Sequence, residues 1–217
     1  MGSIKKELLA AISNYCQSLE KQFDQIPTFR KKELLRLGNY LVEKYTQDEI
    51  PQLIVICTHN SRRSHLGQIW LSVGADYYNL PEIKTFSGGT EATAFNPRAV
   101  AAIQKVGFSI HIEKEDVSNP LYHITWSKNQ IPYPAFSKRY NEPLNPTKEF
   151  GAIMVCTSAD EGCPIVAGCD FRIALPFDDP KAFDDTDLEI QKYDERCEQI
   201  GREMLFVLKN VKDELSI

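Results

Sequence analysis

The sequence predicts an α/β fold: a three-layer open parallel sheet of about four strands with helices on both faces, plus an N-terminal helical hairpin and an inserted flap. From residue 52 onward, short apolar runs alternate with segments of helical periodicity, which is typical of a parallel sheet covered by helices. Residues 1–50 contain helical patterns only, and residues 117–150 follow neither period. We therefore divide the 217 residues into an N-terminal helical extension, 1–50, and an α/β domain, 51–217, with the insertion 117–150.

The N-terminal extension contains two helical patterns between residues 4 and 46, in which apolar side chains recur at spacings of three and four. Pro27 separates the two patterns, and Thr28 is a candidate cap for the second helix. The apolar positions are Leu8, Ile12, Tyr15, Leu19 and Phe23 in the first helix, and Leu34, Leu37, Leu41 and Tyr45 in the second.

In the α/β domain, capping residues mark the ends of the predicted helices. Asn96 and Pro97 suit a helix start, and Gly107 suits the end of the same helix. Thr186 and Glu189 have the spacing of a capping box for the last helix. The predicted strands are 53–57, 83–87, 151–156 and 172–177, and the predicted helices are 64–74, 97–106 and 187–211.

The insertion 117–150 is rich in proline, asparagine and aromatic residues. A loop of this length inside a compact domain is usually functional or carries a hairpin of its own. Two interpretations stay open: a flap, with a β-hairpin, over a functional site, and a packed insertion with no catalytic role.

The net charge of -5 argues against nucleic acid and anionic membranes as main partners. No apolar run approaches the roughly 20 residues of a membrane span, and the N-terminus lacks the apolar core of a signal peptide, so we expect a cytoplasmic protein. The six cysteines then form no disulfide framework, and their spacing matches no zinc site. The cysteines could then act in redox or nucleophilic chemistry. The simpler interpretation is that each is a small buried hydrophobic residue.

The most informative motif is a Cys-x5-Arg loop that runs from Cys57 to Arg63 and is followed by Ser64. It lies between an apolar strand and a helix start, where backbone N–H groups and the helix dipole attract anions. A cysteine placed there should be partly thiolate and therefore nucleophilic. Arg63 can hold two oxygens of an oxyanion, Ser64 can donate to the thiolate and cap the helix, and Asn60 tolerates left-handed backbone. The expected oxyanion-binding residues are Thr58, His59, Asn60, Ser61, Arg62, Arg63 and Ser64.

Other candidates follow other strands. An Asp-Pro turn at Asp179 is usually only local structure, but a thiolate nucleophile needs a general acid for the leaving oxygen. Cys156 ends a predicted strand at the same sheet edge as Cys57, and Cys163 follows seven positions later. If that segment is helical, the two cysteines lie about 10 Å apart, beyond the roughly 7 Å that a disulfide allows. Pairing would then require the segment to unwind; the alternative is two unrelated buried thiols.

Together these motifs resemble the low-molecular-weight protein tyrosine phosphatase superfamily, and more specifically its thioredoxin-coupled arsenate reductases. The resemblance covers residues 53 to about 205 and makes 51–217 a phosphatase-like catalytic domain. It is carried by Val55–Ser64, Phe86–Ala92, Asn96–Val100, the pair Cys156 and Cys163 followed by Pro164, and Phe177–Pro180.

The resemblance implies reduction of arsenate to arsenite. Cys57 attacks arsenate held by Arg63, while Asp179 protonates the departing oxygen. Cys156 then attacks the Cys57 sulfur, and Cys163 resolves that disulfide for reduction by a thioredoxin-like protein. The alternatives are a phosphatase that hydrolyses a phosphate monoester through a cysteinyl-phosphate, and a non-enzymatic module that binds an oxyanion. The implied partners are thus a small oxyanion or phosphate ester and a thioredoxin-like protein, with no tightly bound cofactor.

The family also has a potassium site, whose matching positions here are Asn60, Gln68, Ser87 and Asp116. Gln68 stands where the family has glutamate, so this site would lose a charge. Within the loop, His59 stands where the family has glycine, and Arg62 where it often has a small or apolar residue. His59 is either an exposed loop residue or a second acid or base, and Arg62 either adds charge at the anion site or is a solvated side chain.

Overall fold

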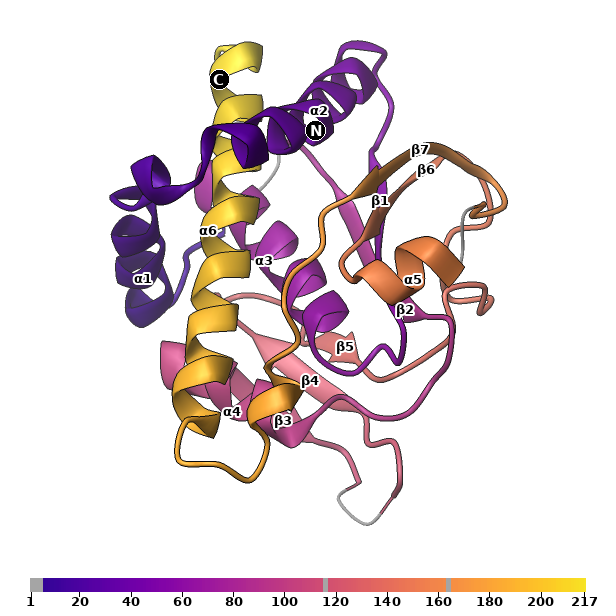
Figure 1. Ribbon diagram of the computed structural model, residues 1–217. Helices are drawn as coiled ribbons and strands as arrows, with labels where there is room; N and C mark the ends of the chain where they lie inside the picture. Colours follow the sequence, from indigo (N-terminus) through magenta and orange to yellow (C-terminus); the bar gives the residue numbers. More distant parts are fainter. Residues whose placement is uncertain (1–5, 115–116, 163–164) are drawn as a thin grey trace.

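The computed structural model describes residues 6–114, 117–162 and 165–217, and it confirms the predicted fold class (Figure 1). At its centre lies a four-stranded sheet in the order β2-β1-β6-β7, whose paired strands are all parallel. The fourth strand begins and ends earlier in the sequence than the predicted range 172–177. The strands are β1 (Gln52–Cys57), β2 (Lys84–Gly89), β6 (Phe150–Met154) and β7 (Cys169–Ala174).

A long C-terminal helix, α6, organises the helical layer and contacts α1, α2, α3 and α4 (Figure 1). Because it packs against so many elements, its apolar stripe is completely buried. The helices are α1 (Ala10–Glu20), α2 (Thr28–Thr46), α3 (Arg63–Tyr78), α4 (Pro97–Val106), α5 (Thr157–Gly162) and α6 (Glu189–Leu215), with 3-10 turns η1 (Phe23–Gln25) and η2 (Pro180–Phe183).

Helices cover both faces of the sheet, as the alternation of side chains along β7 demonstrates. Phe171 stacks on Tyr40 of α2, with the ring centroids 4.6 Å apart. The next residue, Arg172, forms an ion pair with Asp160 of α5 at 2.5 Å. Since successive side chains of a strand point to opposite faces, α2 and α5 lie on opposite sides of the sheet.

The N-terminal segment forms two helices, as predicted, and the predicted leucines of α2 are buried. The first helix is shorter than its apolar pattern, because Leu8 precedes α1 and Phe23 lies in η1. The proposed cap is wrong: Thr28 is already helical, and Pro27 occupies the capping position without a side-chain hydrogen bond. In contrast, Asn96 caps α4 by accepting from the Arg98 N–H at 2.9 Å, and Gly107 ends that helix with φ of 116°. Both of these predictions are confirmed.

The predicted capping box of the last helix is also wrong. Leu188 is the residue at the capping position of α6. The Thr186 hydroxyl donates instead to the Phe183 carbonyl at 2.7 Å, because the preceding turn η2 presents that acceptor. The Glu189 carboxylate accepts from the Asp185 N–H and pairs with Arg98, each at 2.6 Å.

The insertion contributes to a second, three-stranded antiparallel sheet in the order β3-β4-β5. The hairpin expected within 117–150 is present as β4 (Tyr122–Thr125) and β5 (Tyr133–Ala135). It pairs with β3 (Ser109–Ile112), a strand that the sequence patterns did not indicate. The insertion is therefore an ordered part of the fold in its described residues.

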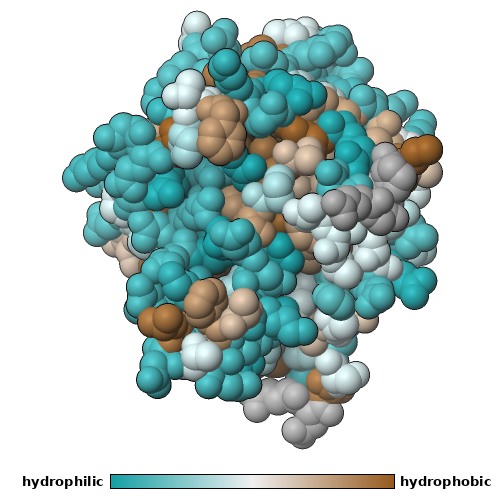
Figure 2. Space-filling model, in the orientation of Figure 1, coloured by the Kyte–Doolittle hydropathy of each residue, from teal (hydrophilic) through white to brown (hydrophobic). Residues whose placement is uncertain are grey.

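The surface in Figure 2 is mostly hydrophilic, and its apolar side chains form small separate groups. Examples of exposed apolar residues are Phe29 on α2 and Ile190 on α6. In the described ranges, no helix combines the length and the apolar content that crossing a bilayer requires.

Candidate active site

The Cys-x5-Arg loop connects β1 to α3 at the carboxyl edge of the sheet. Asn60 has φ of 45°, which confirms the expected left-handed backbone at this position. Its amide is completely buried and bridges two parts of the site: Nδ2 donates to Ser64 Oγ at 2.9 Å, and Oδ1 accepts from the Lys138 N–H at 2.8 Å. Asn60 therefore fixes the loop to the helix on one side and to the insertion on the other.

The Cys57 sulfur lies 3.1 Å from Ser64 Oγ and is almost completely buried. Because Asn60 already donates to the Ser64 oxygen, the Ser64 hydrogen is free to point at the sulfur. A hydroxyl donor in this position stabilises a thiolate. Ser64 does not cap α3, since the helix begins at Arg63 and Arg62 occupies the capping position. That part of the prediction is wrong, because Ser64 lies inside the first turn.

Arg63 connects the loop to the segment that carries the predicted acid. Its Nη1 donates to the Phe177 carbonyl at 2.7 Å, and its Nη2 donates to Asp179 Oδ2 at 2.6 Å. The other carboxylate oxygen of Asp179 accepts from the Lys181 N–H at 3.0 Å. A guanidinium has five N–H donors, so this pairing leaves donors for an oxyanion.

Arg62 lies against α6 and is not a solvated side chain, so that interpretation is wrong. Its Nε donates to the Tyr193 hydroxyl at 2.7 Å, and its Nη2 donates to Asp184 Oδ2 at 3.3 Å. Tyr193 in turn donates to Asp184 Oδ1 at 2.7 Å, and burial raises the pKa of this tyrosine to about 12. The guanidinium of Arg62 is thus held by protein groups, with Asp179 Oδ1 4.0 Å from its Nε.

The remaining loop residues are held from outside by the connection between β2 and α4. The Thr58 carbonyl accepts from the Glu91 N–H at 2.8 Å, and the Ser61 carbonyl accepts from the Asn96 N–H at 2.8 Å. The His59 side chain is 45% exposed and lies 3.6 Å from the Glu91 carboxylate. Exposure therefore agrees with the interpretation of His59 as a loop residue on the surface.

Cys156 lies beside the loop, as its place at the end of β6 predicts. Its sulfur is 3.4 Å from Thr58 Oγ1 and accepts from the Ala159 N–H of α5 at 3.4 Å. The thiol is buried at the start of this short helix. Cys163, the third predicted redox cysteine, lies outside the described residues.

The described positions of the expected potassium site have contacts within the protein. Asn60 Oδ1 accepts from Lys138, Ser87 Oγ lies 3.4 Å from His65 Nδ1, and Gln68 Nε2 donates to the Thr85 carbonyl at 3.2 Å. Gln68 Oε1 is buried without a hydrogen-bond partner among the described residues, and an oxygen that accepts one hydrogen bond keeps a second lone pair, so the potassium site stays a prediction. Asp116, the fourth position, lies outside the described residues.

Two buried polar residues beside the loop were missed by the sequence reasoning. His65 on α3 is fully buried and stacks on Phe95 with centroids 4.1 Å apart, and burial lowers its pKa to about 3, so it is neutral. Lys138 of the insertion is also buried, which lowers its pKa to about 8. The helical periodicity of α3 could have placed His65 on a buried face, but no local pattern indicates the position of Lys138.

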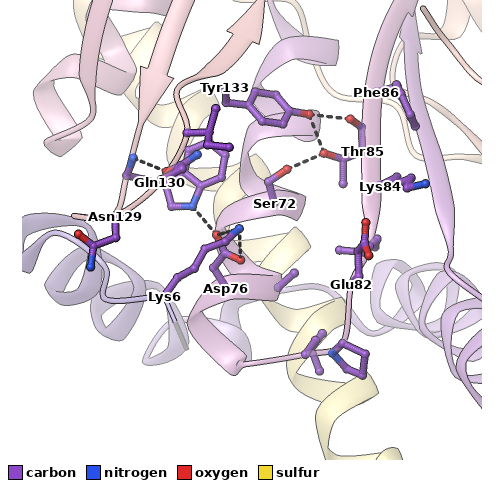
Figure 3. Close-up of a pocket in the computed structure, with 16 residues that line it drawn as sticks. Lys6, Ser72, Asp76, Glu82, Lys84, Thr85, Phe86, Asn129, Gln130 and Tyr133 are labelled. Atoms are coloured by element: carbon purple, nitrogen blue, oxygen red, sulfur yellow. Dashed lines mark hydrogen bonds and ion pairs between the residues drawn. The ribbon is translucent and has the colours of Figure 1, made fainter. Parts of the chain in front are cut away.

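A cavity of about 670 Å³ lies elsewhere, between the start of β2, α3 and the insertion (Figure 3). Several of its polar groups are hydrogen-bonded to one another: Tyr133 donates to the Thr85 carbonyl at 2.6 Å, and Trp126 Nε1 donates to Asp76 at 2.8 Å. Its described lining includes no residue from 57–64. The candidate chemistry is therefore at the Cys57 loop and not in this cavity.

Comparison with known proteins finds no matching family model. An arsenate reductase from Brevibacillus brevis is 30% identical over 125 residues, which cover 58% of this chain and 73% of that protein. An arsenate reductase from Bacillus subtilis is 39% identical over 62 residues, which are 29% of this chain and 42% of that protein, so the second match spans less than half of that relative.

Among solved structures, a crystal structure of a YwlE mutant from Bacillus subtilis aligns with a TM-score of 0.50 and 16% identity. The alignment covers 75% of this chain and 99% of that one. At this identity the likeness is evidence for a shared fold only.

Proposed function

This chain belongs to the family of arsenate reductases, and we propose that it is an enzyme that reduces arsenate to arsenite, with Cys57 as the nucleophile. One observation carries the proposal: a second cysteine, Cys156, has its sulfur 3.4 Å from the hydroxyl of Thr58, the residue next to Cys57. Hydrolysis of a phosphate ester needs no second thiol beside the nucleophile. Reduction of arsenic takes two electrons from two thiols, and Cys156 is the candidate for the second thiol.

The first step uses the loop and the acid. Arg63 and the N–H groups of the loop hold the oxyanion, and the Cys57 thiolate, stabilised by Ser64, attacks arsenic to form an S–As bond. One oxygen leaves as water after it receives a proton from Asp179. The contact of 2.6 Å between Arg63 and Asp179 supports this pairing of oxyanion holder and acid.

The second step transfers the electrons. Cys156 attacks the Cys57 sulfur, an S–S bond forms, and the electron pair of the S–As bond passes to arsenic, which leaves as arsenite. Cys163 then attacks the Cys156 sulfur and releases Cys57 as a thiol. The Cys156–Cys163 disulfide that remains is reduced by a thioredoxin-like protein. The Ala159 N–H supports the Cys156 sulfur as a nucleophile, since it donates to it at the start of α5.

A phosphatase acting on a phosphate monoester is the second candidate. It is favoured by the same contact between Arg63 and Asp179, because Cys57, Arg63 and Asp179 suffice for a cysteinyl-phosphate mechanism. Cys156 would then protect Cys57 against irreversible oxidation by forming a disulfide with it.

The two activities are separated by serine variants of the cysteines. We expect Cys57→Ser, Cys156→Ser and Cys163→Ser each to abolish arsenate-dependent NADPH consumption in the presence of thioredoxin and its reductase. Hydrolysis of a phosphate ester should depend on Cys57 only. Asp179→Asn should slow whichever reaction occurs by about 100- to 10,000-fold.

Cys16→Ala is the matched control. Cys16 is buried in α1, and burial raises the pKa of its thiol to about 12, so it cannot serve as a nucleophile. Its loss should leave both activities unchanged. Rapid ester hydrolysis without arsenate-dependent turnover would replace the reductase by the phosphatase, and oxyanion binding without either reaction would indicate a binding module.

A further inference from the structure

The insertion makes direct hydrogen bonds to the Cys57 loop. Ser137 Oγ donates to the His59 carbonyl at 3.0 Å and accepts from the Thr93 N–H at 2.8 Å. The next residue, Lys138, donates its N–H to Asn60 Oδ1 at 2.8 Å. The insertion thus touches the loop at the residue with left-handed backbone and at the residue before it.

Ser137 is itself held in place within the insertion. Asn119 Nδ2 donates to the Ser137 carbonyl at 2.8 Å, and the Ser137 N–H donates to Asn119 Oδ1 at 3.1 Å. Ser137 is 2% exposed, so water does not compete for these bonds. We call Asn119, Ser137 and Lys138 the clasp.

The clasp acts on one peptide unit of the loop. In a trans peptide the C=O and the next N–H point in opposite directions, so a bond that fixes the His59 carbonyl also fixes the Asn60 N–H. The described chain contains no cis peptide bond, and the His59 carbonyl accepts hydrogen bonds from the hydroxyls of Ser137 and Thr93. A reversed peptide at this position would present a carbonyl in place of a donor, which repels an oxyanion.

We propose that Ser137, braced by Asn119, is a positioning residue that keeps the His59–Asn60 peptide in the orientation needed to bind an oxyanion. This inference rests on the proposed function only for the identity of the anion. It assigns the insertion a role in substrate affinity, through the loop backbone and without direct contact with the reacting atoms.

Oxyanion binding without turnover is the direct test. Binding is measured by calorimetric titration with arsenate and with phosphate in proteins that carry Cys57→Ser. Adding Ser137→Ala should raise both dissociation constants about five- to tenfold over Cys57→Ser alone, because the hydroxyl that donates to the His59 carbonyl and accepts from the Thr93 N–H is lost. Asn119→Ala should weaken binding in the same direction. In the protein with Cys57 intact, the KM for arsenate should rise by the same factor, and the KM for thioredoxin should not change.

Ser127→Ala is the matched control, because Ser127 is a buried serine of the same insertion whose hydroxyl lies 3.5 Å from Gln130 and contacts no loop residue among those described. It should bind arsenate like the parent protein. The proposal is wrong if Ser137→Ala and Asn119→Ala, folded by circular dichroism, bind arsenate as tightly as Ser127→Ala. If the parent binds arsenate but never reduces it, the proposed function fails while the binding comparison still decides the role of the clasp.

Discussion

At the scale of single residues, two adjacent arginines have separate tasks. Arg63 points to Asp179, whereas Arg62 donates to Tyr193 on α6 and to Asp184. They diverge because Arg62 precedes the helix, with φ of -133°, and Arg63 is its first residue. One guanidinium therefore connects the loop to the segment that carries Asp179, and the other connects it to the last helix.

His65 should make the stability of the protein depend on pH. Burial lowers its pKa from the ordinary 6.5 to about 3. Between these values the unfolded chain binds a proton that the folded protein excludes, so falling pH favours unfolding. The contribution is fully present above pH 6.5 and is lost progressively toward pH 3, by up to about 1.4 kcal/mol per pH unit.

Urea unfolding at pH 7 and pH 5 measures this effect. The loss of unfolding free energy between the two values should be about 2 kcal/mol smaller in His65→Gln than in the wild type. His111→Gln is the control, since His111 is exposed on β3 and should leave the pH dependence unchanged. An identical pH dependence in all three proteins would contradict a neutral, buried His65.

At the scale of elements, the end of β2 is where the insertion joins the central sheet. The Gly89 N–H donates to the Lys138 carbonyl at 3.0 Å, and the Tyr140 N–H donates to the Gly89 carbonyl at 2.9 Å. A bridge between Gly89 and Arg139 continues the parallel pairing. The insertion is thus attached to the same sheet edge from which the Cys57 loop emerges.

This attachment depends on the absence of a side chain at Gly88. A Cβ there would lie 2.4 Å from the Tyr140 Cα and 2.8 Å from the Tyr140 nitrogen, which are backbone atoms and cannot rotate away. Gly88→Ala should therefore lower the unfolding free energy by about 1–3 kcal/mol in chemical denaturation.

Gly38→Ala is the matched control in helix α2. A Cβ at Gly38 would be 3.3 Å from the Asn210 side-chain oxygen, which can move, and alanine favours the helix by up to about 1 kcal/mol. This variant should be neutral or more stable. Equal stability of the two variants would show that β2 and residues 138–140 are not packed this closely.

At the scale of the whole molecule, α6 joins the N-terminal helices to the candidate site. Arg30 of α2 donates to Glu203 of α6 at 2.7 Å, and both side chains are largely buried. The Arg30 guanidinium also lies 4.7 Å from the ring centroid of Phe177, whose carbonyl accepts from Arg63. Helix α2 thus contacts the segment that carries Asp179.

Removal of Arg30 should destabilise the whole protein. Arg30→Ala leaves the buried Glu203 carboxylate with Gln199 as its partner, so we expect a loss of about 3 kcal/mol in urea unfolding. Arg36→Ala, which breaks an exposed pair with Glu33, should cost less than about 1 kcal/mol. The combined change Arg30→Met and Glu203→Met should recover most of the loss. A small effect of Arg30→Ala alone would contradict a buried ion pair between α2 and α6.

Local sequence patterns were sufficient to predict the parallel sheet and the residues that lie near Cys57. Apolar runs and helical spacing depend on residues close in the chain, and the carboxyl ends of parallel strands necessarily meet at one edge. For that reason Cys57, Arg63, Asp179 and Cys156 could be grouped in advance. Their catalytic roles stay predictions that the variants above test.

Only the tertiary structure decided what surrounds that group. Ser137 and His59 are 78 positions apart, and Arg62 and Tyr193 are 131 apart, so no local period relates them. The lowered pKa of His65 likewise follows from its complete burial, which tertiary packing produces. The sequence by itself determined a Cys-x5-Arg loop between a strand and a helix at one edge of the sheet. The insertion, α6 and the burial of polar side chains determine the loop's shape, because contacts between distant segments form only when the chain is packed.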